Sequence, residues 1–189
     1  GGAVTATRFT GNAAGNKGGG LCLRNGNSTI AGTVFIRNTA HESGGAVYCY
    51  GDWGHCTVAL ANNTFVLNGA GVGGVLGADR DCTLEIVNNL AAANSTGFSS
   101  GGGNWTLHNN CVHDNRGSEW DGIPDPTGTD GNIRADPVLA DPLAGNVHLQ
   151  PESPCIDAGD NGTVMLATDI DGQPRLQEPA VDIGADESD

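Results

Sequence analysis

The residues best suited to chemistry are four aspartates in the last third of the chain. The sequence DIDG at 169–172 sets the carboxylates of Asp169 and Asp171 on one side of a tight loop, as hard oxygen ligands suited to Ca²⁺. Asp157 and Asp160 lie in a nearby acidic stretch that would complete the coordination shell. No Glu falls at the closing position of an EF-hand loop. Two interpretations stay open: a calcium site, or a turn in which Asp169 and Asp171 only accept hydrogen bonds from backbone amides.

Three aromatic residues lie close together in the sequence YCYGDW, namely Tyr48, Tyr50 and Trp53. Aromatic side chains on a loop form platforms that stack on sugars or contact a partner protein. The alternative is a strand on which the two tyrosines alternate with Cys49 while Trp53 covers the bend. The group is therefore a candidate ligand-contact site.

Polysaccharide cleavage has few candidate residues in this sequence. A lyase that acts on uronates needs a general base, and the chain holds one lysine, Lys17, besides its arginines. A hydrolase needs two carboxyl groups about 5–9.5 Å apart. Asp79 and Asp81 are the closest such pair among the repeats, but they also fit a solvated turn ahead of a strand. His108 and His113 are five residues apart on a strand and a turn, which would separate their side chains rather than place both on one metal ion. Because none of these groups forms a clear catalytic pattern, we expect no catalytic residue.

Six cysteines occur without the Cys-x-x-Cys spacing of a metal site. In a chain this polar they indicate an oxidising compartment and structural disulfides, although the sequence does not choose among the pairings. Two of them begin similar sequences, CTVALANN and CTLEIVNN, and so hold equivalent places in adjacent repeats. The disulfide candidates are Cys22, Cys49, Cys56, Cys82, Cys111 and Cys155.

The elements that carry these residues follow from an internal repeat. A Gly-Gly-small-apolar sequence, GGAV in its clearest form, alternates with a Phe-x-x-Asn sequence that is intact at 9–12, 35–38 and 65–68 and degenerate at 91–94 and 112–115. Its Asn recurs every 21–30 residues. Self-similarity at such a period is typical of solenoids, in which each repeat buries its apolar face against the next. The repeated asparagines are Asn12, Asn38, Asn68, Asn94 and Asn115.

Short alternating stretches bounded by Gly, Asn and Thr predict strands in these repeats, because helical periodicity is absent. The stretches are Thr33–Arg37, Thr57–Ala61, Thr83–Val87 and Asn104–His108. We therefore predict an all-β fold: a right-handed parallel β-helix (solenoid) of about five coils over residues 1–117.

Stacked coils place identical residues in ladders along the axis. We expect Phe9, Phe35 and Phe65 to stack inside, and the repeated asparagines to sit in left-handed bends and bond their neighbours. The pairs Asn62-Asn63, Asn88-Asn89 and Asn109-Asn110 suggest a second ladder.

Charge divides the chain into two parts. Residues 1–117 hold six acidic and six basic residues, so the whole net charge of −14 falls in residues 118–189. The repeats stop at the same point, which predicts an irregular acidic segment that closes or caps the β-helix. Its self-repulsion favours a bound divalent cation. A charge of this sign gives no reason to expect nucleic acid as a partner.

Two resemblances agree with this division. The GGAV and Phe-x-x-Asn sequences resemble the repeats of polymorphic outer membrane proteins, a family of bacterial surface β-helices. Residues 121–187 resemble the C-terminal segment of secreted bacterial β-helix proteins of the choice-of-anchor Q type. This second resemblance rests on ADPVLADP at 135–142, SPCIDAGD at 153–160, DIDGQPR at 169–175 and VDIGA at 181–185. Together they imply an extracellular or cell-surface location.

These observations favour a structural or adhesive surface module without catalytic activity, whose partner is a surface glycan or another cell-surface molecule. The alternative is a β-helix that binds or cleaves carbohydrate. No apolar run is long enough to span a membrane. The sequence begins inside a repeat at Gly1, so we expect either head-to-tail stacking of open coils into filaments or further coils upstream.

Overall fold

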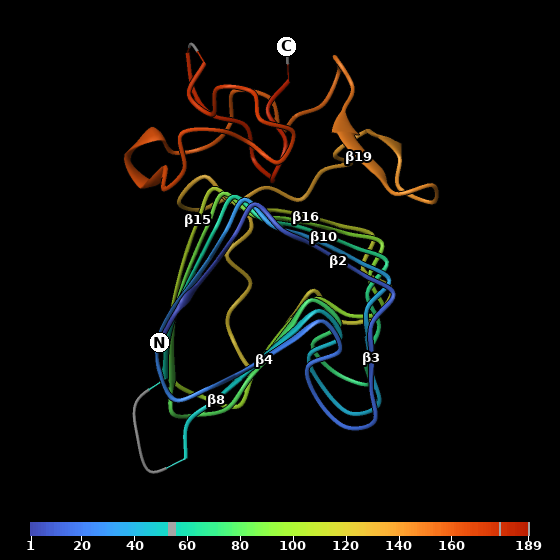
Figure 1. Ribbon diagram of the computed structural model, residues 1–189, viewed down its shortest axis with the longest axis vertical. Helices are drawn as coiled ribbons and strands as arrows, with labels where there is room; N and C mark the ends of the chain where they lie inside the picture. The colour runs from blue at the N-terminus through green and yellow to red at the C-terminus, as the bar shows by residue number, and fades with distance from the viewer. Residues whose placement is uncertain (53–55, 178, 189) are drawn as a thin grey trace.

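The computed structural model describes residues 1–52, 56–177 and 179–188, so the predicted contact residue Trp53 lies outside the described part of the chain. The repeats form a parallel β-helix that Figure 1 shows end-on, with its coils superposed along the axis. Three parallel sheets make its sides, each with five strands, and the chain makes about four turns between the first and last strands of a sheet. The prediction of an all-β parallel β-helix is confirmed.

Each coil contributes one strand to each of the three sheets. The first sheet holds β1 (Ala3–Thr5), β5 (Gly26–Ala31), β9 (Cys56–Ala61), β12 (Cys82–Val87) and β15 (Asn104–His108). The second holds β2 (Arg8–Thr10), β6 (Val34–Ile36), β10 (Thr64–Val66), β13 (Leu90–Ala92) and β16 (Cys111–His113). The third holds β4 (Leu21–Arg24), β8 (Val47–Tyr50), β11 (Leu76–Ala78), β14 (Phe98–Ser100) and β17 (Trp120–Asp121). Between the second and third sheets, β3 (Ala13–Ala14) pairs with β7 (Thr39–Ala40).

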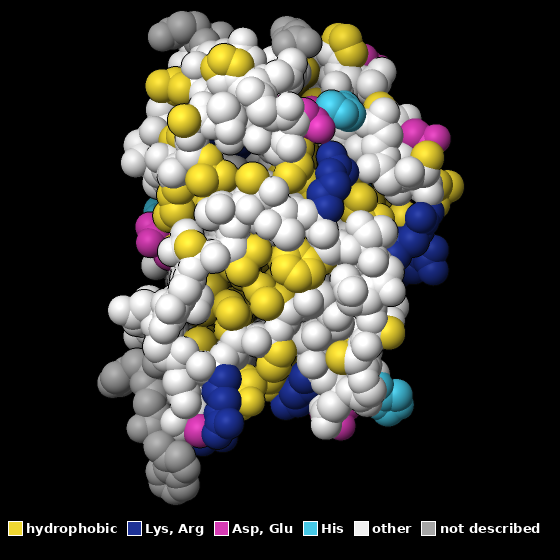
Figure 2. Space-filling view, in the orientation of Figure 1, with side chains coloured by type: hydrophobic (Ala, Val, Ile, Leu, Met, Phe, Trp, Pro, Cys, Tyr) yellow, Lys and Arg dark blue, Asp and Glu magenta, His cyan; other side chains and the backbone are white. Residues whose placement is uncertain are grey.

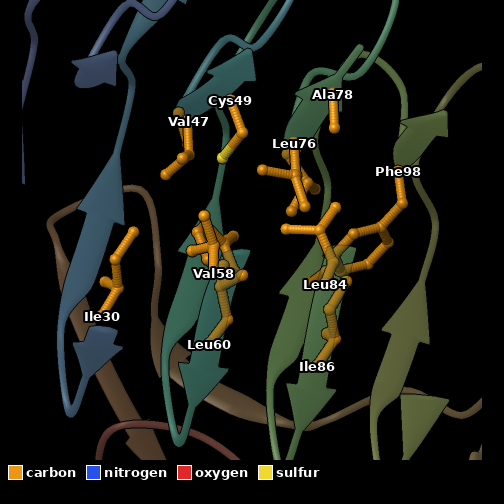
Figure 3. Packing of buried hydrophobic residues seen from close by; sticks show 14 of the residues in the cluster. Ile30, Val47, Cys49, Val58, Leu60, Leu76, Ala78, Leu84, Ile86 and Phe98 are labelled. Atoms are coloured by element: carbon orange, nitrogen blue, oxygen red, sulfur yellow. The ribbon is translucent and has the colours of Figure 1, made fainter. Parts of the chain in front are cut away.

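The core lies inside the coils because the strands of the first sheet alternate. In β12, Cys82, Leu84 and Ile86 are buried, whereas Thr83 and Glu85 between them are exposed. Successive residues of a strand point to opposite faces, so this alternation directs one set of side chains inward. Figure 3 shows these apolar side chains meeting those of the third sheet in the interior.

The repeated aromatic and amide side chains form continuous ladders. Phe9, Phe35 and Phe65 pair in register along the second sheet, with ring centroids 4.9 and 5.1 Å apart. Each repeated Asn donates its side-chain N–H to the Oδ1 of the next over 2.8–3.0 Å, in the order Asn12, Asn38, Asn68, Asn94 and Asn115. A second ladder runs through Asn63, Asn89, Asn110 and Asn132 over 2.9–3.1 Å.

The left-handed backbone falls one residue before each ladder asparagine, which corrects the expectation that the ladder asparagine itself is left-handed. The preceding residue turns the corner, so the backbone N–H and the side chain of the asparagine both bond along the axis. In Asn-Asn pairs the first member takes this role, as Asn88 does at φ 56° ahead of Asn89. In the first ladder, φ lies between 48° and 67° at Gly11, Arg37, Leu67, Ala93 and Asp114.

After residue 133 the C-terminal segment packs on the outer face of the second sheet (Figure 1). Leu149, Cys155 and Ile183 bury against β13 and β16, and Val147 and Ala185 against β6 and β10. Its regular elements are β18 (Leu139–Asp141), antiparallel to β19 (Asn146–Leu149), and a 3-10 helix, η1 (Asn161–Thr163). The segment therefore covers a side of the solenoid, and β6, β10 and β13 are buried throughout.

The two ends of the solenoid differ. At the last coil, β17 continues the third sheet past residue 117, and Ile123 and Ile133 then pack or bridge onto that coil. At the first coil, Val4 and Phe9 are only half-buried. Figure 2 shows apolar side chains gathered in the middle of this end.

Candidate functional site

The outer face of the third sheet carries a groove of about 380 Å³. Tyr48 on β8 lies in it between Lys17 and Asp79, and Glu42 and Asp121 also line it. These residues are far apart in the sequence, and the stacking of successive coils brings them together. Sequence reasoning missed the group because no local motif holds it.

A chain of hydrogen bonds fixes the centre of this groove. Lys17 Nζ donates to the hydroxyl oxygen of Tyr48 over 2.6 Å, and the Tyr48 hydroxyl donates to Asp79 Oδ1. Burial, together with the bond to Asp79, raises the pKa of Tyr48, so its hydroxyl stays protonated and keeps donating. Further along, Ser99 Oγ donates to Asp121 Oδ2 over 2.9 Å.

The predicted aromatic platform is only partly accessible. Tyr48 is 3% exposed and Lys17 Nζ lies 4.5 Å from its ring centroid, so its face is not free to stack on a sugar. Tyr50 is half-buried beside it, with the ring centroids 5.9 Å apart, and Arg24 approaches the Tyr50 ring. Cys49 between the tyrosines points into the core, as the strand alternative implies.

The candidate acids of the repeats are separated by the structure. Asp79 lies in the groove, whereas Asp81 is exposed in the turn before β12 and does not line it. His108 and His113 lie on β15 and β16, which belong to different sheets.

All six cysteines are free thiols, which corrects the expectation of disulfides. The inward alternation of β8, β9 and β12 makes Cys49, Cys56 and Cys82 small core residues, as buried free cysteines commonly are. They touch: hydrogen bonds from Cys49 and then Cys82 lower the pKa of Cys56 to about 6. Cys155 and Cys111 share a hydrogen bond where the C-terminal segment meets the second sheet. Cys22 is exposed.

The carboxylate of Asp169 organises a turn in the C-terminal segment. Its Oδ1 accepts the backbone N–H groups of Asp171 and Gln173 over 2.9 and 2.8 Å, and its Oδ2 accepts that of Glu187 over 3.1 Å. Asp169 is 2% exposed, and its contacts are those of a turn in which the carboxylate accepts hydrogen bonds from backbone amides.

Asp157 and Asp160 lie in a separate loop. Asp160 Oδ1 accepts the Gly162 N–H at the start of η1, and Asp157 lies 3.4 Å from the Ala180 N–H. Among residues 1–52, 56–177 and 179–188, the group of side chains close enough to share a metal ion is His148, Asp171 and Asp186. Of the four predicted calcium ligands, only Asp171 belongs to it.

A buried arginine holds the same part of the segment, and sequence reasoning missed it. Arg175 is 2% exposed and donates to the carbonyl oxygens of Asp182, Gly184 and Asp186 over 2.5–3.1 Å. Its Nε lies 3.7 Å from Glu187. The sequence did offer one signal: residues 118–189 hold sixteen acidic residues but only two arginines, Arg134 and Arg175, and no lysine.

Comparison with known proteins gives one match. The model of the Chlamydia polymorphic membrane protein repeat matches residues 32–50, which span β6, β7 and β8 and include the second GGAV sequence. No curated protein and no solved structure matches the chain. In the described part, no helix is long and apolar enough to cross a membrane. The chain is thus a parallel β-helix with a repeat like that of the polymorphic membrane proteins.

Proposed function

We propose that this protein is a cell-surface adhesive module that binds a glycan in the groove of the third sheet. The observation that carries the proposal is a fixed set of hydrogen-bonding side chains on a face that the C-terminal segment leaves open. The match to a repeat named for membrane proteins supports the surface location.

The scaffold suits such a role because it is rigid. Two ladders of asparagine bonds and a phenylalanine stack join one coil to the next, so groove residues from different coils keep their spacing. A site held in its binding geometry loses little entropy when a ligand binds.

Charge narrows the class of glycan. Glu42, Asp79 and Asp121 line the groove against the single cation Lys17, so it is acidic overall. Like charges repel across an interface, which disfavours uronate polymers, and a glycan that carries amino groups is favoured. The carboxylates and the Ser99 and Ser100 hydroxyls offer acceptors and donors to its hydroxyl groups.

Binding of three probes to the full chain tests the proposal: chitosan oligosaccharides, neutral xylo-oligosaccharides and polygalacturonate. We expect chitosan oligosaccharides to bind most tightly, and the Glu42→Gln/Asp121→Asn variant to weaken that binding. The matched control is Asp81→Asn/Glu85→Gln, which removes the same charge from exposed positions outside the groove. Equal loss in both variants, or a preference for polygalacturonate, would reject the glycan groove.

Glycan cleavage in the same groove is the second candidate, because three carboxylates line it and a hydrolase needs two. Chromatography of the bound oligosaccharide after prolonged incubation distinguishes the two. Intact oligosaccharide supports a binding module, whereas shortened products that Asp79→Asn abolishes support a hydrolase.

A further inference from the structure

The C-terminal segment contains a pocket of about 430 Å³ that is separate from the groove. His148 of β19, Asp171 of the DIDG turn and Asp186 near the C-terminal end line it. One ligand atom from each of the three lies within 4.8 Å of the others. The imidazole sits between the carboxylates, with Nδ1 3.0 Å from Asp186 Oδ1 and Nε2 3.5 Å from Asp171 Oδ2.

Asp186 supplies independent evidence for a missing ligand. Its residue is 3% exposed, and its Oδ2 accepts the Leu149 N–H over 3.2 Å. Its Oδ1 is buried and has no hydrogen-bond partner, although it lies close to His148 Nδ1. A buried carboxylate oxygen without a partner is costly, and such atoms are rare in folded proteins. Asp186 and His148 both line the pocket.

We propose that His148, Asp171 and Asp186 bind a Zn²⁺ ion in this pocket. One imidazole nitrogen and two carboxylate oxygens form a ligand set that Zn²⁺ accepts, whereas Ca²⁺ takes oxygen ligands. Ligand atoms about 2.0–2.2 Å from a tetrahedral ion lie roughly 3.3–3.6 Å from one another. One ligand atom from each residue already lies within 4.8 Å of the others, and a movement of the His148 side chain, which is 47% exposed, brings one of its nitrogens to this spacing from both carboxylates.

The surroundings hold the ligands in place. The Leu149 N–H orients Asp186, and the Asp169 carboxylate holds the turn that carries Asp171. Arg8 of β2 lies 3.8 Å from Asp171 Oδ1, leaving Oδ2 as the oxygen nearest the imidazole. The three ligands come from separate stretches of the segment, so the ion ties β19 to the DIDG turn and to the C-terminal end. The fourth position faces the pocket, as in zinc sites that keep a water or an exogenous ligand.

Zinc titration of the tag-free full chain against a chromophoric chelator tests the site. We expect one Zn²⁺ per chain, and His148→Ala and Asp171→Asn should each lower the affinity by more than about 100-fold, since even outer-shell partners of a metal are worth about 10–100-fold. Both positions are substantially exposed, so neither change removes buried packing. The matched control is His113→Ala, which removes the histidine of another exposed His–Asp pair, with Asp136.

Co²⁺ substitution identifies the ligands by absorption. We expect ligand-field bands without a thiolate charge-transfer band, and their loss in His148→Ala but not in His113→Ala. A thiolate band would assign the ion to a cysteine such as the exposed Cys22 and overturn the proposal. Absence of Zn²⁺ binding, Ca²⁺ binding without Zn²⁺ binding, or unchanged Zn²⁺ affinity in both ligand variants would also overturn it.

Discussion

The β-helix and the C-terminal segment are stabilised in different ways. In the β-helix the same contact recurs from coil to coil, as the bonds from Asn38 to Asn68 and from Asn68 to Asn94 show. In the segment, hydrogen bonds from side chains that occur only once stabilise the fold. The Arg175 guanidinium donates to three carbonyl oxygens, and the Asp169 carboxylate accepts from three backbone N–H groups. Repetition spreads the stabilisation over many equivalent residues, whereas the segment concentrates it in a few.

The largest expected effect therefore falls on Arg175. Arg175→Met should destabilise the segment by about 3–5 kcal/mol, because it removes one partner of a buried pair and leaves carbonyl oxygens unsatisfied. Hydrogen exchange should show the loss in residues 138–188 while the solenoid strands keep their protection. Arg116→Met, at an exposed position, is the control and should change little. Equal loss of protection in both regions would mean that they unfold as one unit.

A ladder substitution should cost less and act on the other region. Asn68→Leu removes bonds to both neighbouring asparagines and to the Phe35 carbonyl, and should lower the free energy of unfolding of the solenoid by about 1–3 kcal/mol. Chemical denaturation measures this change, with the exposed Asn16→Leu as control. A cost no greater than that of the control would refute the ladder as a source of stability.

Asn88 connects the two regions: its side chain bonds the C-terminal segment and its backbone shapes the solenoid. A substitution that changes only the side chain therefore tests the docking contact alone. Its side chain bonds the backbone of Asp160 in both directions, over 2.8 and 3.1 Å, while its left-handed backbone turns the corner before Asn89. Asn88→Gly keeps the backbone conformation and removes the docking bonds, so we expect a loss of about 1–2 kcal/mol. The loss should appear as exchange in residues 157–163, and exchange confined to β12 and β13 would contradict this.

A further effect concerns pH and the thiols of the core. The pKa of Cys56 is about 6 in the folded protein, below its ordinary value of 9. A depressed pKa stabilises the fold above the ordinary value and ceases to do so as pH falls through about 6. Stability should thus rise with pH between about 6 and 9, because the folded chain has lost a proton that the unfolded chain keeps. Cys56→Ala should flatten this rise in pH-dependent melting, and Cys22→Ala should not.

The sequence predicted the solenoid well because its signals are local and repeated. Phe-x-x-Asn occurs in the first three coils and its Asn in all five, so Phe35 and Phe65 and their asparagines could be assigned to ladders by spacing alone. The corner conformation was misplaced by one residue, because Arg37 and Leu67 carry no side-chain signature of a left-handed bend. The disulfides were predicted from the number of cysteines and the polar composition, and composition does not show that Cys49, Cys56 and Cys82 pack in the core as small apolar side chains.

The sites were harder to predict because contacts between distant residues build them. Lys17, Tyr48 and Asp79 meet only when three coils stack in register. His148 and Asp186 meet only after the segment folds back on itself, so the DIDG sequence pointed to Asp171 but not to its neighbours. Docking against the side of the solenoid depends on single contacts, such as the Ala185 N–H that Thr64 Oγ1 accepts.

Hydrogen exchange of the full chain with and without chitosan oligosaccharide tests the central claim, that the solenoid offers a binding groove distinct from the C-terminal segment. We predict added protection in peptides that contain residues 42–48, 78–80 and 99–101, with residues 146–149 and 169–173 unchanged. Protection confined to the C-terminal segment, or absent from the chain at saturating oligosaccharide, would contradict the account.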